Sequence, residues 1–577
     1  MRLETLKMYW SRVTLAFRMV RSLVMFMVDE HRRGTLAENL RSFIKARGVA
    51  VSVDMSHSDL LEEKAANPKL RDKSFLYFGE TTFTYGQMDE NANRLANFLE
   101  SLGGGPGVGL AIMMKNSPRW LDVFYGLEKL GMYTIPVNVA LRHEQLVYII
   151  DNSEASILVI DHDLLHHYRA VTDSLPGITT VIVNTEGAPE GFEVPDDMES
   201  LDSAYSTEVG TTKPSVLRNP EDLCIIMYTS GTTGLPKGVV YRYNSTNVKA
   251  LSVITRMLTS GSDVAYTCYP LFHANALFLS VTTSMHAGGS VAVATKFSAS
   301  GFWDDVRRYG ATTFNGLGAV MPILMKQPPG PNDGDNKVRL VISSGCPAEL
   351  WRDFEKRFGL TIYEGYGAVD GGSTVLTNFG TAPPGSMGKP IGGKIRVIDA
   401  EGRDCPAHVP GELICEVGKK KSSVEYFKDA EATNDKVRDG WIYTGDLVYQ
   451  DESGFLYFVG RNTESMRCRG ENVSAYEVES AVLRYPCVLE CAVYAVPSEL
   501  AEDEIMVTLV PVDGETVEPT VLRDFLSERL AKFAVPRYYR AVSALPKTET
   551  HRVIKKDLES LGVTPDTVDT MAGDPAR

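Results

Sequence analysis

Apolar residues recur every three or four positions at the start of the chain, which predicts an amphipathic helix there. The series runs Leu3, Leu6, Trp10, Val13, Phe17, Val20, Val24 and Met27. Its longest uncharged run, 22–28, has seven residues, whereas a helix that spans a bilayer needs about 20 mostly apolar residues. Basic residues lie beside the aromatic ones, so two arrangements stay open: a helix on an anionic membrane surface, or a helix packed against protein.

Further along the chain, short apolar runs alternate with helical patterns, which predicts mainly parallel α/β layers. Helices are predicted at 85–100 and 118–130, and strands at 75–78, 108–114, 133–137, 157–160 and 180–183. Between about 390 and 460, β-rich stretches replace this alternation, and a compact mixed segment follows. We therefore expect an α/β protein with a large body of several subdomains, one of them β-rich, and a small mobile α+β lid domain.

Four segments follow from this pattern. We expect an amphipathic helical segment at 1–48, a large domain at 49–460, a C-terminal lid domain at 461–562 and a flexible tail at 563–577. The lid assignment rests on the change from long β-rich stretches to short alternating helices and strands.

Charge divides the chain in two. The 577 residues carry a net charge of −15, but residues 1–47 hold ten Lys or Arg and four Asp or Glu, a local +6. The acidic remainder argues against general binding of nucleic acid, whose phosphates need basic residues. The eight cysteines form no C-x-x-C pair, which favours a reducing, cytoplasmic compartment. A peripheral contact of residues 1–30 with the inner face of a membrane is compatible with this.

The segment YTSGTTGLPKG, residues 228–238, carries the strongest chemical signal. It follows the apolar run 223–227, so we expect a loop that leaves a strand. Its hydroxyls, glycine N–H groups and lysine can wrap a polyphosphate. It is not a Walker A loop, because Pro236 precedes the lysine and Gly238 follows it.

This loop resembles that of the adenylate-forming acyl-CoA synthetases, and further blocks match the family in order over about 55–560. They are Pro270–His273 beside the acyl pocket, Ser343–Pro347 and Glu364–Gly367 flanking adenine, Tyr443–Asp446 at the ribose, Gly460–Arg461 at the hinge, and Arg469–Val473 in the loop for thioester formation. Blocks at 296–305 and 470–474 are similar to fatty-acid transport protein and very-long-chain acyl-CoA synthetases. The second block is also similar to carnitine/crotonobetaine-CoA ligases.

The resemblance implies an ATP-dependent carboxylate–CoA ligase that forms an acyl-adenylate and then an acyl-CoA thioester from a fatty or other apolar acid. ATP, Mg²⁺ and coenzyme A would take part. ATP or AMP would be bound by Thr229, Ser230, Gly231, Thr232, Thr233, Gly234, Lys237, Ser344, Gly345, Cys346, Glu364, Gly365, Tyr366, Gly367, Val369, Asp446 and Arg461.

The remaining roles are also implied by the resemblance. Arg552, Lys237 and His273 would be catalytic, and Asp370 would hold the metal ion. The acyl pocket would include His273, Asn275, Gly316 and Gly318; the glycines would leave room for the acyl chain, although glycines are as often turn residues. CoA would be bound by Arg469, Gly470 and Glu471, and Thr463 would be the hinge.

Three departures from the family pattern bear on activity. Val369 replaces a threonine, and Asp370 is one methylene shorter than the usual metal-binding glutamate. Thr463 replaces the usual Asp or Lys of the hinge. Arg552 stands where the family has its catalytic lysine, and its guanidinium is cationic but bulkier and planar. Three outcomes stay open: Arg552 serves, Lys555 or Lys556 substitutes, or adenylation is weak.

Two other functions remain as alternatives. An acyl-adenylating enzyme could transfer the acyl group to a separate carrier protein, or the chain could be a catalytically impaired nucleotide- or acyl-binding relative. Val369 and Arg552 are the features that favour the second alternative. A homodimer is also left open by the sequence.

Overall fold

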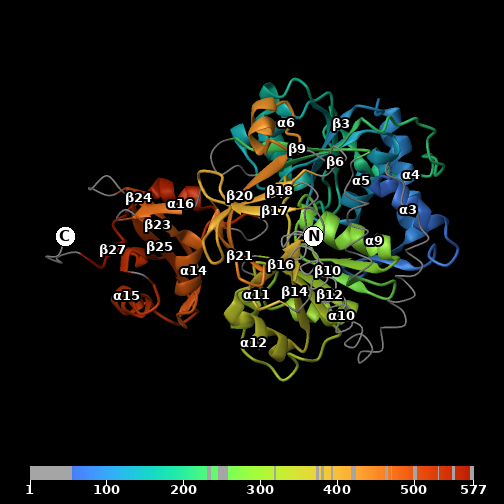
Figure 1. Ribbon diagram of the computed structural model, residues 1–577. Coiled ribbons are helices and arrows are strands. Elements are labelled where there is room, and N and C mark those ends of the chain that lie inside the picture. The colour runs from blue at the N-terminus through green and yellow to red at the C-terminus, as the bar shows by residue number, and fades with distance from the viewer. Residues whose placement is uncertain are drawn as a thin grey trace, which may run out of the picture.

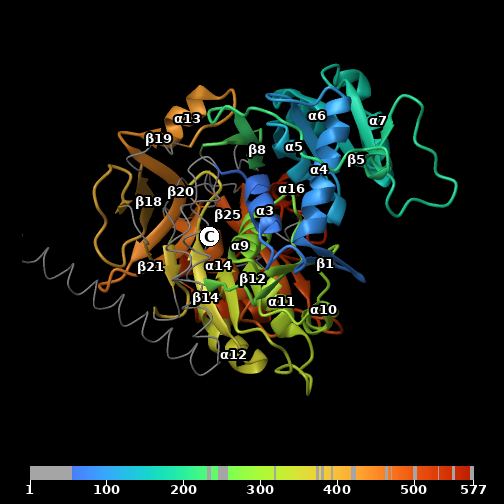
Figure 2. The same ribbon diagram turned by 90° about the vertical axis from the view of Figure 1, so that its right-hand side faces the viewer.

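The computed structural model describes most of the chain after position 54 (Figures 1 and 2). The described residues are 55–229, 235–244, 258–317, 320–371, 376–378, 382–390, 394–417, 424–461, 465–468, 471–497, 503–530, 532–548 and 553–571. The predicted N-terminal helix and ten predicted site residues lie outside them: Ser230, Gly231, Thr232, Thr233, Gly234, Gly318, Thr463, Arg469, Gly470 and Arg552. Within the described ranges, no helix has the length and hydropathy that crossing a membrane requires.

The first lobe contains a seven-stranded sheet in the order β7-β6-β5-β3-β4-β8-β9, parallel except for the pair β8–β9. Its strands are β3 (Gly109–Met113), β4 (Tyr133–Pro136), β5 (Ala155–Asp161), β6 (Thr180–Asn184), β7 (Glu199–Ser200), β8 (Leu223–Thr229) and β9 (Lys237–Arg242). Its helices are α3 (His57–Ala66), α4 (Tyr85–Ser101), α5 (Pro118–Lys129), α6 (His143–Asn152) and α7 (Leu165–Arg169), with short turns η1 (His162–Leu164), η2 (Thr172–Ser174) and η3 (Leu201–Tyr205). Every residue of β3 is buried, as in a parallel sheet covered on both faces.

Two helices of this lobe begin at capping residues. Thr84 Oγ1 accepts the Gln87 N–H at 3.1 Å while Gln87 Oε1 accepts the Thr84 N–H at 2.8 Å, a capping box that starts α4. Ser117 Oγ accepts the Trp120 N–H at 3.3 Å, and Pro118 occupies the first turn of α5. Both helices therefore begin where their sequence supplies partners for unpaired backbone groups.

The second lobe is built on a 14-stranded sheet that is parallel in its centre and antiparallel beyond β14. The order is β17-β18-β20-β21-β16-β15-β14-β13-β12-β10-β11-β1-β2, with β19 paired to β20. The strands are β1 (Ser74–Phe78), β2 (Thr81–Thr84), β10 (Val264–Thr267), β11 (Ser290–Val293), β12 (Thr313–Leu317), β13 (Leu340–Ser344), β14 (Thr361–Tyr366), β15 (Leu376–Asn378), β16 (Ser386–Pro390), β17 (Ile395–Ile398), β18 (Gly411–Glu416), β19 (Val437–Arg438), β20 (Trp441–Gln450) and β21 (Leu456–Arg461).

The helices of this lobe include one unusual element, the π-helix η4 (Asn275–Thr282). The others are α9 (Thr283–Ala287), α10 (Phe302–Tyr309), α11 (Val320–Lys326), α12 (Ala348–Phe358) and α13 (Ala430–Lys436). In the parallel centre of the sheet, Gly316 lies opposite Ser343, which lies opposite Glu364. Ligands of open α/β sheets bind outside the carboxyl ends of such strands, so this edge is where a site is expected.

The C-terminal elements lie to one side of the body, in orange to red in Figure 1. They are the hairpin β22 (Ser465–Cys468) and β23 (Glu471–Ser474), the four-stranded sheet of β24 (Val488–Pro497), β25 (Asp503–Pro511), β26 (Tyr538–Ala541) and β27 (Val568–Asp569), the helices α14 (Ala475–Val482), α15 (Pro519–Ser527) and α16 (Lys555–Leu561), and the turn η6 (Lys532–Ala534). The α/β body and smaller C-terminal part confirm the predicted fold class.

Two features refine the C-terminal part. Val568 and Asp569, which the sequence places in a flexible tail, pair with Tyr539 and Tyr538 in the sheet. The part also touches the body, because Lys326 Nζ of α11 donates to the carbonyl oxygens of Val488 and, at 3.1 Å, Leu489.

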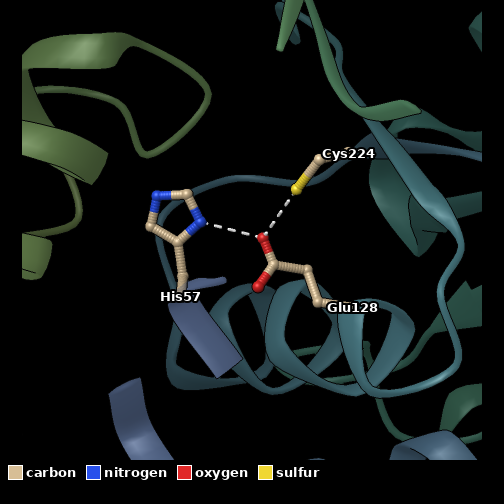
Figure 3. Close-up of side chains that lie close together, drawn as sticks. All are labelled: His57, Glu128 and Cys224. Atoms are coloured by element: carbon tan, nitrogen blue, oxygen red, sulfur yellow. Dashed lines mark hydrogen bonds and ion pairs between the residues drawn. The ribbon is translucent and has the colours of Figure 1, made fainter. Parts of the chain in front are cut away.

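Glu128 of α5 joins three elements in the core of the first lobe (Figure 3). Its Oε1 lies 2.8 Å from His57 Nδ1 and 3.4 Å from Cys224 Sγ, and its Oε2 accepts the Ser58 N–H at 2.8 Å. Burial, together with the Glu128 charge, raises the pKa of the Cys224 thiol well above its usual value. The thiol therefore stays protonated and donates, and the carboxylate ties α3 and β8 to α5.

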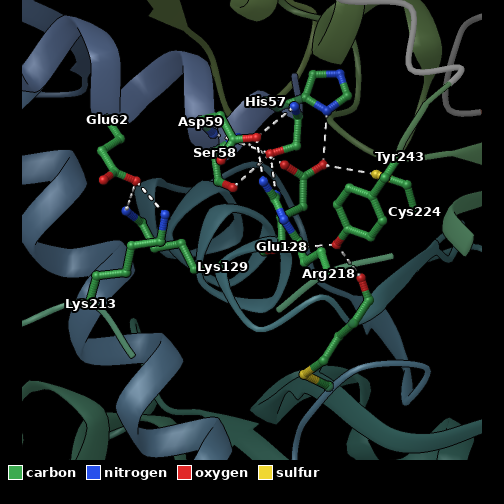
Figure 4. Close-up of polar contacts among 12 residues, drawn as sticks. His57, Ser58, Asp59, Glu62, Glu128, Lys129, Lys213, Arg218, Cys224 and Tyr243 are labelled. Carbon is green, nitrogen blue, oxygen red and sulfur yellow. Dashed lines mark hydrogen bonds and ion pairs between the residues drawn. The ribbon is translucent and has the colours of Figure 1, made fainter. Parts of the chain in front are cut away.

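Charged side chains lie beside this buried cluster (Figure 4). Arg218 donates to Ser56 Oγ at 2.9 Å and to Asp59 Oδ2 at 2.5 Å, and its guanidinium lies 4.9 Å from the centre of the Tyr243 ring. These contacts hold the start of α3 against the segment that leads into β8. Polar contacts, in addition to apolar packing, therefore fix the start of α3 on the body.

We expect Glu128→Ala to destabilise the first lobe. It leaves the Ser58 N–H and the His57 and Cys224 side chains without their buried acceptor, a loss of about 3 kcal/mol or more in the free energy of unfolding. Glu416→Ala is the control, because it removes an ion pair with Lys394 that is largely exposed and should cost less than about 1 kcal/mol. Denaturant unfolding measures both; equal losses would contradict the structural role of Glu128.

Candidate active site

The ends of the predicted phosphate loop are held by the hairpin β8–β9. Thr229 lies opposite Lys237, and Thr229 Oγ1 donates to the Lys237 carbonyl oxygen at 3.4 Å. A Cβ on Gly238 would lie 2.7 Å from a methyl of Ile226, so only glycine fits after the lysine. Lys237 Nζ lies 5.3 Å from the centre of the Tyr426 ring, within reach of a cation–π contact.

Tyr426 connects this lysine to a carboxylate. Its hydroxyl donates to Asp370 Oδ2 at 2.7 Å, and Lys436 Nζ lies 2.9 Å from the same oxygen. Burial acts to raise the pKa of Asp370, but the Lys436 ammonium and the hydrogen bonds outweigh it and hold that pKa below its usual value. Asp370 is therefore ionised, and its Oδ1 has no side-chain partner among the described residues.

A second buried carboxylate, Asp446, lies in β20 opposite Arg461 at the end of β21. Its Oδ2 accepts the Tyr366 hydroxyl at 2.5 Å, and its Oδ1 lies 3.0 Å from Arg461 Nε. Within the described part of the chain, no donor is aligned for a hydrogen bond with Oδ1. Burial and the adjacent carboxylate raise the pKa of Tyr366 well above its usual value. The phenol thus stays a donor, and Oδ1 can accept a hydroxyl group from a ligand.

Glu364 forms the third carboxylate position, at the carboxyl end of β14. It accepts the Gly345 N–H and, at 3.4 Å, the Cys346 N–H. Burial raises its pKa to about 7, although the backbone donors oppose the shift. Gly345 has a φ of +91°, which favours glycine, and no atom lies within 4 Å of a Cβ built there or on Gly367. This strand edge therefore brings together Ser344, Gly345, Cys346, Glu364, Gly365 and Gly367. The space beside Gly345 and Gly367 is open.

Two of the predicted acyl-pocket residues, His273 and Asn275, lie just before and at the start of the π-helix η4. His273 Nδ1 accepts the Asn275 N–H at 3.2 Å, and burial lowers the His273 pKa to about 4, so the ring is neutral near pH 7. The assignment of Gly316 to the acyl pocket stays a prediction, and the structure gives this glycine a packing role. A Cβ on Gly316 would lie 2.5 Å from Met321 Sδ, so the glycine makes room for a core side chain.

The structure thus brings seven of the described site residues into two groups, apart from those at the edge of β13 and β14. Thr229, Lys237, Val369 and Asp370 gather around Tyr426, and Tyr366, Asp446 and Arg461 form the other group. Within the first group, the Tyr241 hydroxyl donates to the Val369 carbonyl oxygen at 3.1 Å. Glu471 begins β23. Of the lysines beside Arg552, Lys555 pairs with Glu479 at 2.9 Å.

Sequence reasoning missed Tyr426 and Lys436. Neither belongs to a recognisable motif, and each reaches Asp370 from a distant part of the chain. Tyr426 is placed by backbone pairing, since Val240 N–H donates to the Glu425 carbonyl at 2.9 Å and Phe427 N–H donates to the Gly238 carbonyl at 2.7 Å. Only knowledge of this pairing could have found them.

Comparisons with known proteins agree with this geometry. The family model described as "AMP-binding enzyme" matches residues 61–418, and that of the "AMP-binding enzyme C-terminal domain" matches 477–552. The chain is 32% identical to the medium/long-chain-fatty-acid–CoA ligase FadD17 of Mycobacterium marinum, over 79% of this chain and 87% of that protein. It is 30% identical to the crotonobetaine/carnitine–CoA ligase of Salmonella agona, over 83% and 93%.

A solved structure shows the same fold. The anthranilate CoA ligase AuaEII, crystallised in complex with anthranoyl-AMP, superposes with a TM-score of 0.78 at 23% identity and covers 89% of this chain and 98% of its own. The match extends over both the body and the C-terminal part.

Glu364 should make the protein less stable as the pH rises. Its pKa is about 7 in the folded protein against an ordinary value of 4.5, so its contribution is full below about pH 4.5 and is lost as the pH rises through 7. We expect Glu364→Gln to gain stability relative to the wild type between pH 5 and 8, by up to about 3 kcal/mol. Melting temperatures across that range measure it.

Asp122 also has a pKa raised to about 7 by burial, but it is present in both proteins and cancels in the difference. Parallel melting curves for the two proteins would contradict the assignment to Glu364.

Proposed function

The chain belongs to the AMP-binding enzyme family, and we propose that the site residues described above join an apolar carboxylic acid to coenzyme A. The chain is an AMP-forming acid–thiol ligase that uses ATP, Mg²⁺ and coenzyme A. In the first step the acid's carboxylate attacks the α-phosphate of ATP and pyrophosphate leaves. In the second step the CoA thiol displaces AMP and forms the thioester.

The observation that carries the proposal is the buried Asp446. Its one oxygen takes the Tyr366 hydroxyl, while the other lies beside Arg461 with no hydrogen-bond donor aligned among the described residues. A buried carboxylate oxygen without an aligned hydrogen-bond donor is stabilised when a ligand supplies that donor. The hydroxyls of a ribose are such donors, so Asp446 and Arg461 would hold the nucleotide with its adenine toward Glu364 and Gly345.

Both reacting partners are anions, so the site must gather positive charge. Lys237 supplies an exposed ammonium beside Tyr426, and we assign it, with the hydroxyl residues 229–233, to the leaving pyrophosphate. Asp370 suits Mg²⁺, which takes one carboxylate and keeps waters or phosphate oxygens at its other positions. The bound ion would neutralise phosphate charge, and Lys436 and Tyr426 orient the carboxylate through its second oxygen.

The other assignments rest on the family resemblance. Arg552 would bridge the acid and the α-phosphate, Thr463 would be the hinge, and Arg469, Gly470 and Glu471 would meet CoA. An apolar acid is favoured because the relatives named above include a fatty-acid–CoA ligase. Transfer to a carrier protein remains the second candidate.

Pyrophosphate release with a panel of carboxylic acids, with and without CoA, tests the proposal. We expect release with fatty acids and a thioester only when CoA is present. Release without thioester formation would favour a carrier protein as acceptor. Silence with every acid would refute catalysis.

Substitutions at Arg552 locate the working cation in the same assay. Arg552→Ala should lower adenylation by roughly 10²–10³-fold, because it removes a cation from the transition state, and Arg552→Lys should keep or raise activity. Lys555→Ala is the matched control, since Lys555 pairs with Glu479. If Lys555→Ala causes the larger loss, the role belongs to Lys555.

Cytoplasmic localisation, a homodimer and peripheral contact with the inner face of a membrane are proposals that rest on sequence. The membrane contact follows from the basic amphipathic pattern of residues 1–30. Liposomes that contain anionic lipid should co-sediment the full chain but not a chain that lacks residues 1–47. Equal recovery of both chains would rule out this anchor.

A further inference from the structure

Two asparagines form a buried polar pair beside the parallel strands. Asn275 opens the π-helix η4 and Asn315 lies in β12, and each is 6% exposed. Asn315 Nδ2 donates to Asn275 Oδ1 at 3.0 Å and to Ser280 Oγ at 3.0 Å. We call Asn275 and Asn315 the asparagine pair.

The π-helix makes this pair. Asn275 and Ser280 are five residues apart, and in an α-helix such residues point about 140° away from each other. In η4 both reach the same amide of Asn315. π-Helical turns occur frequently at functional sites, so this distortion places polar groups against β12 where regular helix packing would not.

The hydrogen bonds of the pair are incomplete. Asn275 Nδ2 and Asn315 Oδ1 meet no partner in the described ranges. Turning either amide over exchanges its nitrogen and oxygen but still leaves one end of each side chain unpaired.

A third buried asparagine shows the contrast. Asn116, 7% exposed, donates to the carbonyls of Tyr269 at 2.9 Å and Ala294 at 2.8 Å, and its Oδ1 accepts the Leu271 N–H at 2.7 Å. Asn116 is thus satisfied at both ends of its amide by the fold, unlike the pair.

The pair lies on the same parallel strands as part of the candidate nucleotide site, but on their other face. Asn315 precedes Gly316, which lies opposite Ser343 and, one strand further, Glu364. Side chains alternate between the two faces of a sheet along each strand, so Asn315 points to the face opposite that of Ser343 and Glu364. The Asn275 N–H also donates to His273 Nδ1. An acid whose carboxylate reacts at the nucleotide would run its chain toward this part of the sheet.

We propose that the asparagine pair binds a hydroxyl group on the acyl chain, so that the ligase selects hydroxylated acids over saturated acids of the same length. A hydroxyl can accept from the free amide N–H and donate to the free amide oxygen at once. A methylene in that place would exclude water from both groups and leave them unpaired. The inference rests on the proposed ligase function and narrows its substrate to a largely apolar acid with one hydroxyl.

The test compares the best saturated acid of the panel with its monohydroxy derivatives, one for each carbon position, by kcat/KM for pyrophosphate release. We expect one positional isomer to exceed the saturated acid by roughly 100-fold or more, because sites built for a substrate hydroxyl reject analogues without it. Asn275→Val/Asn315→Val should abolish or reverse that preference, measured as the ratio of kcat/KM for the hydroxylated acid to kcat/KM for the saturated acid. The single variants provide the same readout if the double variant folds poorly.

Asn116→Val is the matched control, because it also removes a buried asparagine. It should lower the melting temperature without changing the ratio between hydroxylated and saturated acids. Equal or better use of the saturated acid by the wild type would overturn the inference and leave the proposed function standing, as would a preference that survives in the double variant. Silence with all acids would instead refute the proposed function, and the inference with it.

Discussion

A carboxylate leaves water at high cost unless cations or hydrogen-bond donors replace its hydration, and this constraint organises the protein. Glu128, Glu364 and Asp446 are almost fully buried, and Asp370 is partly so. Each draws its partners from other elements: Glu128 from α3 and β8, Asp370 from α13, Asp446 from β14 and β21. The acidic body is thus held together at the points where its charges are buried.

These carboxylates differ in how completely their hydrogen bonds are satisfied, and the difference separates Glu128 from Asp370 and Asp446, the two that are proposed to meet the ligand. Glu128 uses both oxygens within the core, beside a protonated thiol. Asp370 Oδ1 has no side-chain partner in the described part of the chain, and Asp446 Oδ1, 3.0 Å from Arg461 Nε, has no aligned hydrogen-bond donor there. A site that binds ATP needs polar groups whose hydrogen bonds are incomplete in the protein, because the ligand then completes them. The asparagine pair, proposed to bind the acyl chain, also has amide groups without a partner among the described residues.

Parallel strand register explains why these groups meet. Gly316, Ser343 and Glu364 lie level across β12, β13 and β14 although the chain between them forms helices. Glycines with left-handed backbone, such as Gly345, turn the chain at this edge and leave open space. The hairpin β8–β9 adds Lys237 from the first lobe. The segment that contains Tyr426 is hydrogen-bonded to this hairpin, and Tyr426 contacts both Lys237 and Asp370.

The sequence by itself determined the α/β class, the main strands and helices of the first lobe, and the motifs whose residue types suit phosphate and ribose. Local periodicity and capping residues suffice for these features, because they depend on neighbours within a few positions. The partners Tyr426, Lys436 and Asn315 were decided only by tertiary structure, since strand pairing between distant segments places them. Gly316 shows the same limit: its motif does not indicate that Met321 from the next helix packs against it. Packing depends on contacts between side chains that are far apart in the sequence, and a local sequence pattern does not indicate those contacts.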